Sequence, residues 1–289
     1  MQPVTVTSVH ALAPADDAAV VGLLALAREC DGVAAPLHPA APPGDARPDD
    51  ANYFLARRAG ALVGVFNLVG YQETEGSGLV HPDHRRRGIG RQLIAAANAE
   101  VVRRGFASWL LVCEATLPSG PRFAAAVGGN CEFAEYRLLL DPARLPAPAP
   151  TSALDCRLAT SADATALAAI VAAAFGDPLT EVRGWVSADF DHADRYWYIA
   201  SLAQAPIGTL RVRIIEGEGT YITGFSIAPA YQNQRLGRQL LLTVLARLRA
   251  EGHPTVLIEV ETNNASANAL YRAVGFDPLR TFEYYRVEV

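Results

Sequence analysis

Two stretches of the chain, Ala18–Cys30 and Ala162–Phe175, place apolar residues three and four positions apart. This spacing puts the apolar residues on one face of a helix and predicts two amphipathic α-helices, the second beginning after the cap residue Ser161. Each helix is followed by two short apolar runs that are separated by a turn, which predicts a β-hairpin. The runs are 53–56 with 62–68, and 196–201 with 207–214.

A second pair of predicted helices begins near Gly90 and Gly237, each shortly after a strand that leads to a proline. Apolar residues again recur at helical spacing, and each helix stops at a glycine, Gly105 or Gly252, where the backbone can turn left-handed. Both helices are followed by a strongly apolar run, which predicts a buried strand. These strands are 109–113 and 256–260.

The order of elements is the same in both halves because the sequence repeats itself. Pro82 aligns with Pro229, a shift of 229 − 82 = 147, and the match continues without a gap. Identities at this shift extend over a helix, a turn, a strand and a second helix, which indicates a duplication. They are Gly90–Leu93 with Gly237–Leu240, Gly105 with Gly252, Leu110 with Leu257, Glu114 with Glu261, and Ala126–Gly128 with Ala273–Gly275.

A proline-rich stretch separates the two copies. Residues 142–152 contain four prolines among small residues, which favours a semi-rigid linker over a helix or a sheet interior. We therefore predict two domains of mixed α/β structure, at 1–141 and 153–289, each with a mixed sheet.

Composition narrows the class of protein. Of the 289 residues, 51% are apolar and 19% are charged, which is typical of a globular protein. The net charge of −5 argues against nucleic acid as a partner, because binding to a phosphate backbone requires a basic face. The four cysteines show no metal-binding spacing, so we expect reduced thiols and no metal. No apolar segment reaches the length of a membrane span, so we expect a cytoplasmic protein with no membrane partner.

The loop between strand and helix in the first copy suggests an anion site. Gly88 and Gly90 lie at the start of the predicted helix, where backbone N–H groups and the helix dipole favour a phosphate. The arginines of 85–87 add charge-assisted contacts. The alternative is an ordinary helix entry with a solvated basic face, and the recurrence of the same context in the second copy favours the anion site.

These residues resemble the GNAT acetyltransferase signature [QR]-x-x-G-x-[GA], through Arg85, Gly88 and Gly90. In the second copy Gln232 and Gly237 match, but Arg235 replaces a glycine and needs an unstrained φ. The resemblance implies that both loops bind the pyrophosphate of acetyl-coenzyme A. The residues it implies are Val80, Arg85, Arg87, Gly88, Ile89, Gly90 and Arg91 in the first copy, and Ile227, Gln232, Arg235, Leu236, Gly237, Arg238 and Asn264 in the second.

The second copy also resembles the GNAT segment N-x-x-A-x-x-L-Y-x-x-x-G-F, from Asn264 to Phe276. In that family the asparagine lies beside the pantetheine arm and the tyrosine protonates the departing thiolate, which implies these roles for Asn264 and Tyr271. The alternative for Tyr271 is a core aromatic residue. The thioester carbonyl would be polarised by backbone N–H groups of residues 225–227.

Glu259 is the candidate general base, since it interrupts the apolar strand 256–260. The string Ile258-Glu259-Val260 is similar to one in ribosomal-protein alanine N-acetyltransferases, in which this glutamate is the base. The alternative, a strand residue in a salt bridge, is equally compatible with the sequence.

The first copy lacks these groups, because Val112, Leu117 and Ala124 occupy the positions of Glu259, Asn264 and Tyr271. A division of roles between two GNAT halves resembles the plan of the mycothiol synthases. We expect an N-acetyltransferase that acts directly on an amine of a small molecule or peptide. A non-catalytic acyl-coenzyme A sensor is the alternative.

The acceptor has no signature in the sequence. It is expected near residues 31–50 and 176–192, where aromatic residues could line a pocket or belong to the core. These aromatic residues are Trp185, Phe190, Tyr196 and Trp197. Monomer and homodimer both remain open.

Overall fold

The computed structural model describes residues 2–32, 37, 47, 49–70, 74–146 and 154–289. The chain forms two compact units of similar internal density: residues 1–134 with 280–289, and residues 135–279. Each is described by itself below. Most of the predicted acceptor region at 31–50, and most of the predicted linker at 142–152, lie outside the described residues.

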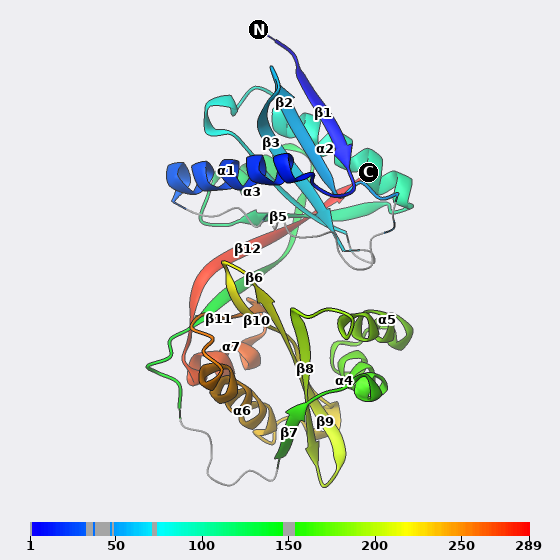
Figure 1. Cartoon of the computed structure of the whole chain (residues 1–289), viewed down its shortest axis with the longest axis vertical. Helices are drawn as coiled ribbons and strands as arrows, with labels where there is room; N and C mark the ends of the chain where they lie inside the picture. The colour runs from blue at the N-terminus through cyan, green and yellow to red at the C-terminus, as the bar shows by residue number, and fades with distance from the viewer. Residues whose placement is uncertain (1, 33–36, 38–46, 48, 71–73, 147–153) are drawn as a thin grey trace. The chain divides into compact units, whose positions relative to one another are not determined.

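The first unit is a sheet with helices on both faces (Figure 1). Its strands are ordered β1-β2-β3-β4-β5-β12, where β12 is Phe276–Glu288, and only β4 and β5 run parallel. The elements in chain order are β1 (Val4–Val9), α1 (Pro14–Asp31), β2 (Tyr53–Arg58), β3 (Ala61–Val69), β4 (Glu75–Val80), the 3-10 turn η1 (Pro82–His84), α2 (Ile89–Arg104), β5 (Ser108–Glu114) and α3 (Ser119–Ala126).

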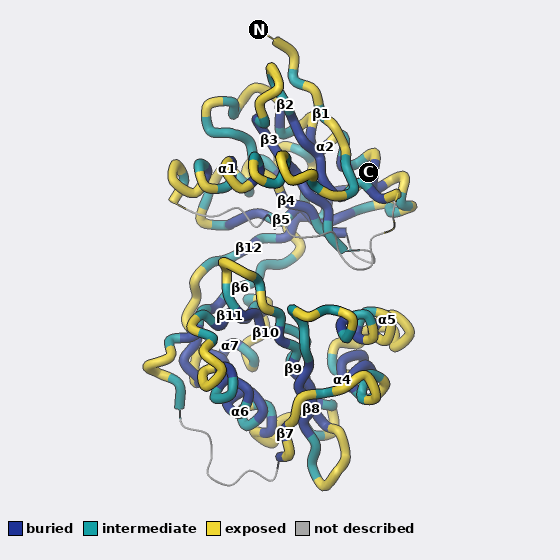
Figure 2. Tube along the Cα trace, viewed as in Figure 1, coloured by how far each residue is buried: buried dark blue, intermediate teal, exposed yellow. Residues whose placement is uncertain are grey.

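Alternation along the strands decides which helix covers which face. Leu55 and Val65 pack with α1, whereas Phe54 and Phe66 pack with the apolar face of α2. Successive side chains on a strand point to opposite faces, so each strand of this hairpin is buried on both sides. Figure 2 shows the buried positions along these strands.

The second unit repeats this arrangement. Its elements are β7 (Leu154–Leu158), the 3-10 turn η2 (Ser161–Asp163), α4 (Ala164–Phe175), α5 (Leu179–Asp189), β8 (Arg195–Leu202), β9 (Ala205–Ile215), β10 (Gly219–Ile227), η3 (Pro229–Tyr231), α6 (Leu236–Ala250), β11 (Val256–Glu261) and α7 (Ala265–Val274). The strand order is β6-β11-β10-β9-β8-β7, where β6 is Asn130–Leu140. Helices α4 and α5 cover one face, and α6 covers the other (Figure 1).

Two strands do not follow the predicted domain boundaries of 1–141 and 153–289. Strand β6 (Asn130–Leu140) pairs with β11, so residues 135–140 complete the sheet of the second unit. Strand β12 (Phe276–Glu288) pairs with β5, so residues 280–288 complete the sheet of the first unit. Each unit is therefore built from both halves of the chain, a non-local pairing that no local sequence pattern reveals.

The predicted helices and strands all form. Helix α2 ends at Gly105 with φ 90°, as expected, whereas α6 ends at Ala250 and the left-handed Gly252 follows two residues later. Helix α5 was not predicted. Its aromatic neighbours belong to the core, because Trp197 is fully buried and Trp185 and Phe190 pack on the same cluster.

Candidate active site

Both predicted phosphate loops have the same backbone path. In the first unit Arg86 and Gly88 have φ values of 60° and 81°, and in the second Asn233 and Arg235 have 61° and 62°. The second loop thus keeps the glycine conformation without the glycine. The expectation that Arg235 has an unstrained φ is wrong, because a non-glycine residue in this region is held at a cost of about 1 kcal/mol.

One side chain in each loop hydrogen-bonds to a backbone carbonyl at the end of the preceding strand. Arg85 Nε donates to the carbonyl of Val80 at 3.1 Å, and Gln232 Nε2 donates to the carbonyl of Ile227 at 3.0 Å. Arg85 also forms a bidentate ion pair with Asp31, with hydrogen bonds of 2.8 and 2.6 Å, and this pair keeps the Asp31 pKa below its usual range. The first residue of the signature, Arg85 or Gln232, therefore stabilises the conformation of the loop and does not direct a charge toward an anion.

The loop amides remain available. Within the described parts of the chain, no N–H from Arg86 to Arg91, or from Asn233 to Arg238, donates a hydrogen bond. In each loop these residues lead into the first turn of α2 or α6, where the N–H groups have no partner inside the helix. Consecutive free amides at a helix start form an anion-binding surface.

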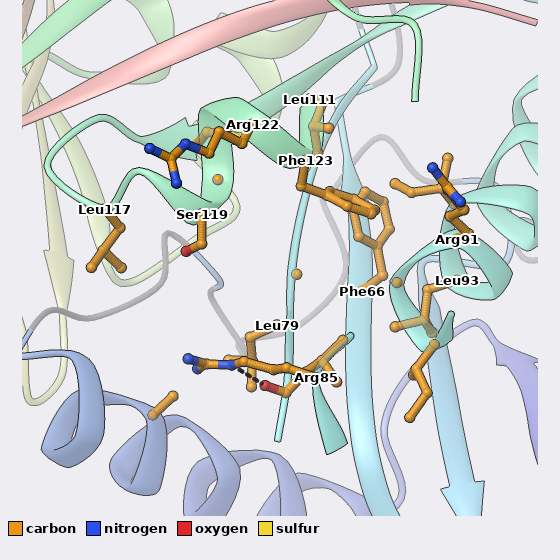
Figure 3. A pocket seen from close by; sticks show the side chains of 18 of the residues that line it. Phe66, Leu79, Arg85, Arg91, Leu93, Leu111, Leu117, Ser119, Arg122 and Phe123 are labelled. Carbon is orange, nitrogen blue, oxygen red and sulfur yellow. Dashed lines mark hydrogen bonds between the residues drawn. The ribbon is translucent and has the colours of Figure 1, made fainter. Parts of the chain in front are cut away.

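The first unit holds a cavity of about 460 Å³ beside its loop. Strands β4 and β5 pair only at Glu75–Leu110 and Gly76–Leu111, and their ends then diverge. The cavity lies along these diverging ends, and Ser119 and Arg122 of α3 lie across it from Arg85 (Figure 3). Its apolar wall includes Phe66 and Phe123.

The predicted residues line this cavity with one exception. Val80, Arg85, Gly88, Ile89, Gly90 and Arg91 line it, whereas Arg87 does not. Arg86, one of the three arginines that the sequence analysis expected to contact an anion, also lines it. Sequence reasoning missed Arg122 and His84, which add positive or titratable groups to the lining. No signal in the sequence points to Arg122.

The cavity of the first unit has no proton donor at the position of Tyr271, since Ala124 is fully buried there. Burial raises the pKa of the Cys113 thiol to about 12, so this lining residue stays protonated. The Glu114 carboxylate accepts from the Thr116 hydroxyl at 2.9 Å and pairs with Arg280 at 3.4 Å. The carboxylates among the lining residues, Asp31 and Glu114, are thus both ion-paired.

Strand β10 of the second unit has a bulge that its counterpart β4 lacks. The pairing of β10 with β9 shifts between Thr223 and Ser226, and Gly224 in the bulge has φ 51°. Strand β4 pairs with β3 without a shift from Glu75 to Val80. Strands β10 and β11 pair only at residues 220–222 with 256–258. A bulge re-aims backbone groups, here at the opening between two diverging strands.

Tyr271 lies on α7 against this bulge. Its ring centroid is 6.2 Å from that of Phe225, and the residue is only 6% exposed. Among the described residues nothing hydrogen-bonds its hydroxyl. Burial raises the Tyr271 pKa far above its ordinary value, so the phenol keeps its proton throughout the neutral range.

Asn264 caps helix α7. Its side-chain oxygen accepts from the amide of Ala267 and from the Ser266 hydroxyl, both at 3.1 Å. The residue is exposed, and only its amide nitrogen is left for a ligand. This capping role is visible in the sequence, because asparagine is a preferred N-cap residue.

Glu259 forms a cross-strand ion pair with Arg137, with Arg137 Nε 2.8 Å from Glu259 Oε1. Burial disfavours the charge on Arg137, but Glu259 and neighbouring groups outweigh it and raise the Arg137 pKa. Arg137 also lies over the ring of Tyr221 at 5.3 Å. Sequence reasoning missed this partner, because Arg137 reaches β11 only through the exchanged strand β6.

Two further features of the described part of the chain bear on the class of site. No helix there is long and apolar enough to cross a membrane. No cluster of three or more His, Cys, Asp or Glu side chains there could hold a metal ion. All four cysteines are free thiols.

Comparison with known families agrees with both copies. The profile described as "Acetyltransferase (GNAT) family" matches residues 165–276, and that described as "Acetyltransferase (GNAT) domain" matches residues 49–125. A mycothiol acetyltransferase of Thermobispora bispora is 31% identical, with 91% of this chain and 93% of the relative covered. One from Nocardia farcinica is 32% identical, with 90% of each chain covered.

Solved structures share the whole two-unit fold. A GCN5-related N-acetyltransferase from Sphaerobacter thermophilus has a TM-score of 0.78 at 19% identity, covering 100% of this chain and 97% of its own. A tandem GNAT protein from the clavulanic acid biosynthesis pathway has a TM-score of 0.77 at 22% identity, covering 99% and 98%. Together with the repeat and the two loops, these findings show that the chain belongs to the GNAT acetyltransferase family, as an acyltransferase with two tandem GNAT domains.

Proposed function

We propose that the protein transfers the acetyl group of acetyl-coenzyme A to an amine of a small molecule or peptide, and that the second unit carries out the reaction. GNAT acetyltransferases use acetyl-coenzyme A. The observation that carries the assignment is the bulge of β10 together with the buried phenol of Tyr271 beside it. The first unit has neither feature.

In the proposed reaction the free amides from Asn233 to Arg238 bind the diphosphate of the coenzyme. Gln232 holds the loop, and Leu236, Gly237 and Arg238 form the helix start. The amine nitrogen attacks the thioester carbonyl, whose oxygen is stabilised by amides at the bulge of residues 223–226. As the C–N bond forms and the C–S bond breaks, Tyr271 donates its proton to the thiolate.

The proton lost by the attacking ammonium needs an acceptor, and Glu259 is the proposed base. Its carboxylate is 29% exposed on the strand beside the bulge, so a water molecule or an amine can reach it. The ion pair with Arg137 opposes this role, because the Arg137 guanidinium occupies the carboxylate oxygen Oε1. Binding of a cationic acceptor would have to compete with Arg137.

Replacement of Tyr271 tests the assignment. Tyr271→Phe removes only the hydroxyl, and we expect kcat to fall about 100-fold while the affinity for acetyl-coenzyme A stays within twofold. Coenzyme release with a thiol reagent and calorimetric titration measure the two quantities. Tyr198→Phe, at another buried tyrosine of the same core, is the control. An unchanged kcat in Tyr271→Phe would remove the phenol from the mechanism.

We further propose that the first unit is a non-catalytic acyl-coenzyme A site, since it has the loop and the cavity but Ala124 at the acid position. Calorimetry should then give two acetyl-coenzyme A molecules per chain. A Cβ at Gly90 would lie 3.0 Å from the Phe123 ring, so Gly90→Val narrows the cavity. We expect Gly90→Val to bind one molecule and to keep its turnover. A single molecule bound by the unmodified protein would contradict this.

The relatives from Thermobispora bispora and Nocardia farcinica are mycothiol acetyltransferases, which makes amines related to mycothiol one class to test as acceptors. Turnover by a thiol-release assay over a panel of amines decides the class.

A further inference from the structure

Three arginines lie on the face of the second unit that α4 and α5 share. Leu210 and Val212 of β9 pack with α6, so the alternate residues Arg211 and Arg213 point to the opposite face. Arg213 is directly opposite Arg195 in the pairing of β8 with β9. We call Arg195, Arg211 and Arg213 the arginine row.

Such a row is unfavourable unless something offsets it. Like charges directly opposite on neighbouring strands destabilise a sheet. Asp189, which is 2% exposed, pairs with Arg211 at 2.6 Å and with Arg195 at 3.3 Å, and it accepts from the Trp197 indole. The single negative charge of Asp189 thus neutralises only one of its two arginine partners. With the half-exposed Asp194, the row and its carboxylates keep one positive charge in excess.

Arg213 is the least satisfied member. Its Nε lies 3.6 Å from Asp194, too far for a good hydrogen bond, and is buried without another partner among the described residues. Burial lowers the Arg213 pKa, and the neighbouring Arg195 lowers it further, while Asp194 opposes the shift. The Arg213 side chain is 32% exposed, so an anion can reach this half-buried guanidinium and accept from its unused donors.

The row adjoins the proposed reaction centre. Arg213 pairs in register with Tyr221, and Arg211 with Thr223 at the start of the bulge. The Thr223 hydroxyl is also buried with no hydrogen-bond partner in the described chain. Residues two positions apart on a strand are about 7 Å apart. A small molecule can therefore reach from Arg213 to the bulge.

The corresponding face of the first unit lacks the row. Gly64 pairs with Val80 as Gly208 pairs with Ile227, so the positions of Arg211 and Arg213 correspond to Asn67 and Val69. Asn67 is buried and accepts from Ser77 at 3.0 Å. Both units share the fold, but the arginine row occurs in the unit that also has the bulge and the phenol of Tyr271.

We propose that Arg213, supported by Arg211, binds a carboxylate of the acceptor, so that the acceptor is an amino acid or another small amine that carries a carboxylate. This inference rests on the proposed acetyl transfer in the second unit. Glu259 on the same face offers a negative group to the ammonium end of such a molecule, and the arginine row offers a positive one to its other end. A phosphate dianion fits less well, because the excess is one charge and Asp194 and Glu218 are near.

The test compares each amino acid with its carboxamide, which keeps the amine and removes the negative charge. With saturating acetyl-coenzyme A, we expect kcat/KM for the preferred amino acid to exceed that for its amide by about 10-fold or more. Arg213→Gln should erase this preference by raising KM for the amino acid, with kcat within twofold. Arg249→Gln, at an exposed arginine of α6, is the matched control.

A binding measurement separates this inference from the proposed function. Arg211 lies 5.7 Å from the ring of Trp185 and 6.0 Å from that of Trp197, so tryptophan fluorescence reports an anion at the row. Titration of the whole protein with amino acids should change the emission, whereas the amides and the Arg213→Gln variant should not. Such a result without turnover of any amine would support the carboxylate site and reject acetyl transfer.

Equal performance of amino acids and amides in both assays would overturn the carboxylate site. So would a preference that Arg213→Gln leaves intact, or amino acids that neither bind nor react.

Discussion

At the scale of single residues, Arg235 shows how a motif can be altered and its backbone geometry kept. Its φ of 62° lies close to the 81° of Gly88, and the six amides that follow the same path are available in both loops. A side chain in this conformation is destabilising by about 1 kcal/mol. A backbone amide does not depend on the side chain, so the second loop keeps its free amides at a small loss of stability.

Exchanging the two residue types tests this account. Arg235→Gly should raise the free energy of unfolding by about 1 kcal/mol, and Gly88→Ala should lower it by a similar amount, because a Cβ at Gly88 meets open space and only φ is strained. Chemical denaturation measures both. Acetyl-coenzyme A affinity should change less than threefold in Arg235→Gly. A large loss of affinity would mean that the Arg235 side chain itself holds the phosphate.

At the scale of elements, the ion pair between β6 and β11 decides how Glu259 can act. Arg137 and Glu259 are directly opposite in the antiparallel register, with side chains 14% and 29% exposed. A pair at this depth contributes about 1 kcal/mol, and removal of one partner leaves the other partly desolvated. The ion pair with Arg137 and the proposed role as general base therefore compete for the Glu259 carboxylate.

A double-mutant cycle separates these demands. Glu259→Gln and Arg137→Met should each lower the free energy of unfolding by about 1 kcal/mol, and the double variant should recover part of that loss. If Glu259 is the base, kcat falls about 100-fold in both variants that lack it and is maintained in Arg137→Met. If the loss of kcat instead parallels the loss in the free energy of unfolding across all three variants, Glu259 has only a structural role.

The sequence predicted the helix, hairpin, loop and following helix and strand that the two copies share, because helical spacing, the repeat and the glycines act locally. The segment from Asn264 to Phe276 also predicts Tyr271 as the general acid, and this role stays a prediction. The sequence could not indicate Arg137 or the bulge at Thr223–Ser226, since both depend on which strands pair. Helix α5 was missed because its apolar residues are few and Gly184 interrupts them.

At the scale of the whole molecule, the exchange of β6 and β12 makes each unit depend on both halves of the chain. A cut at the proline-rich stretch leaves β11 without β6, and β5 without β12. An unpaired strand edge exposes backbone hydrogen-bonding groups and favours association with other chains.

Two fragments test this dependence. Fragment 135–279 keeps the β6 segment that pairs with β11, and we expect a cooperative thermal transition and a monomer by size-exclusion chromatography. Fragment 153–289 lacks that segment, and we expect it to aggregate or to melt without cooperativity. A cooperative transition of equal midpoint in both fragments would show that the exchanged strand is dispensable.

The exchanged strands also bear on the history of the gene. After a duplication, a copy that has lost its catalytic groups is normally free to decay. Here the first copy supplies β6 to the second unit and the second copy supplies β12 to the first, so we expect deletion of either copy to destabilise the other. Selection for one reaction is then enough to preserve two domains, whatever the first one binds.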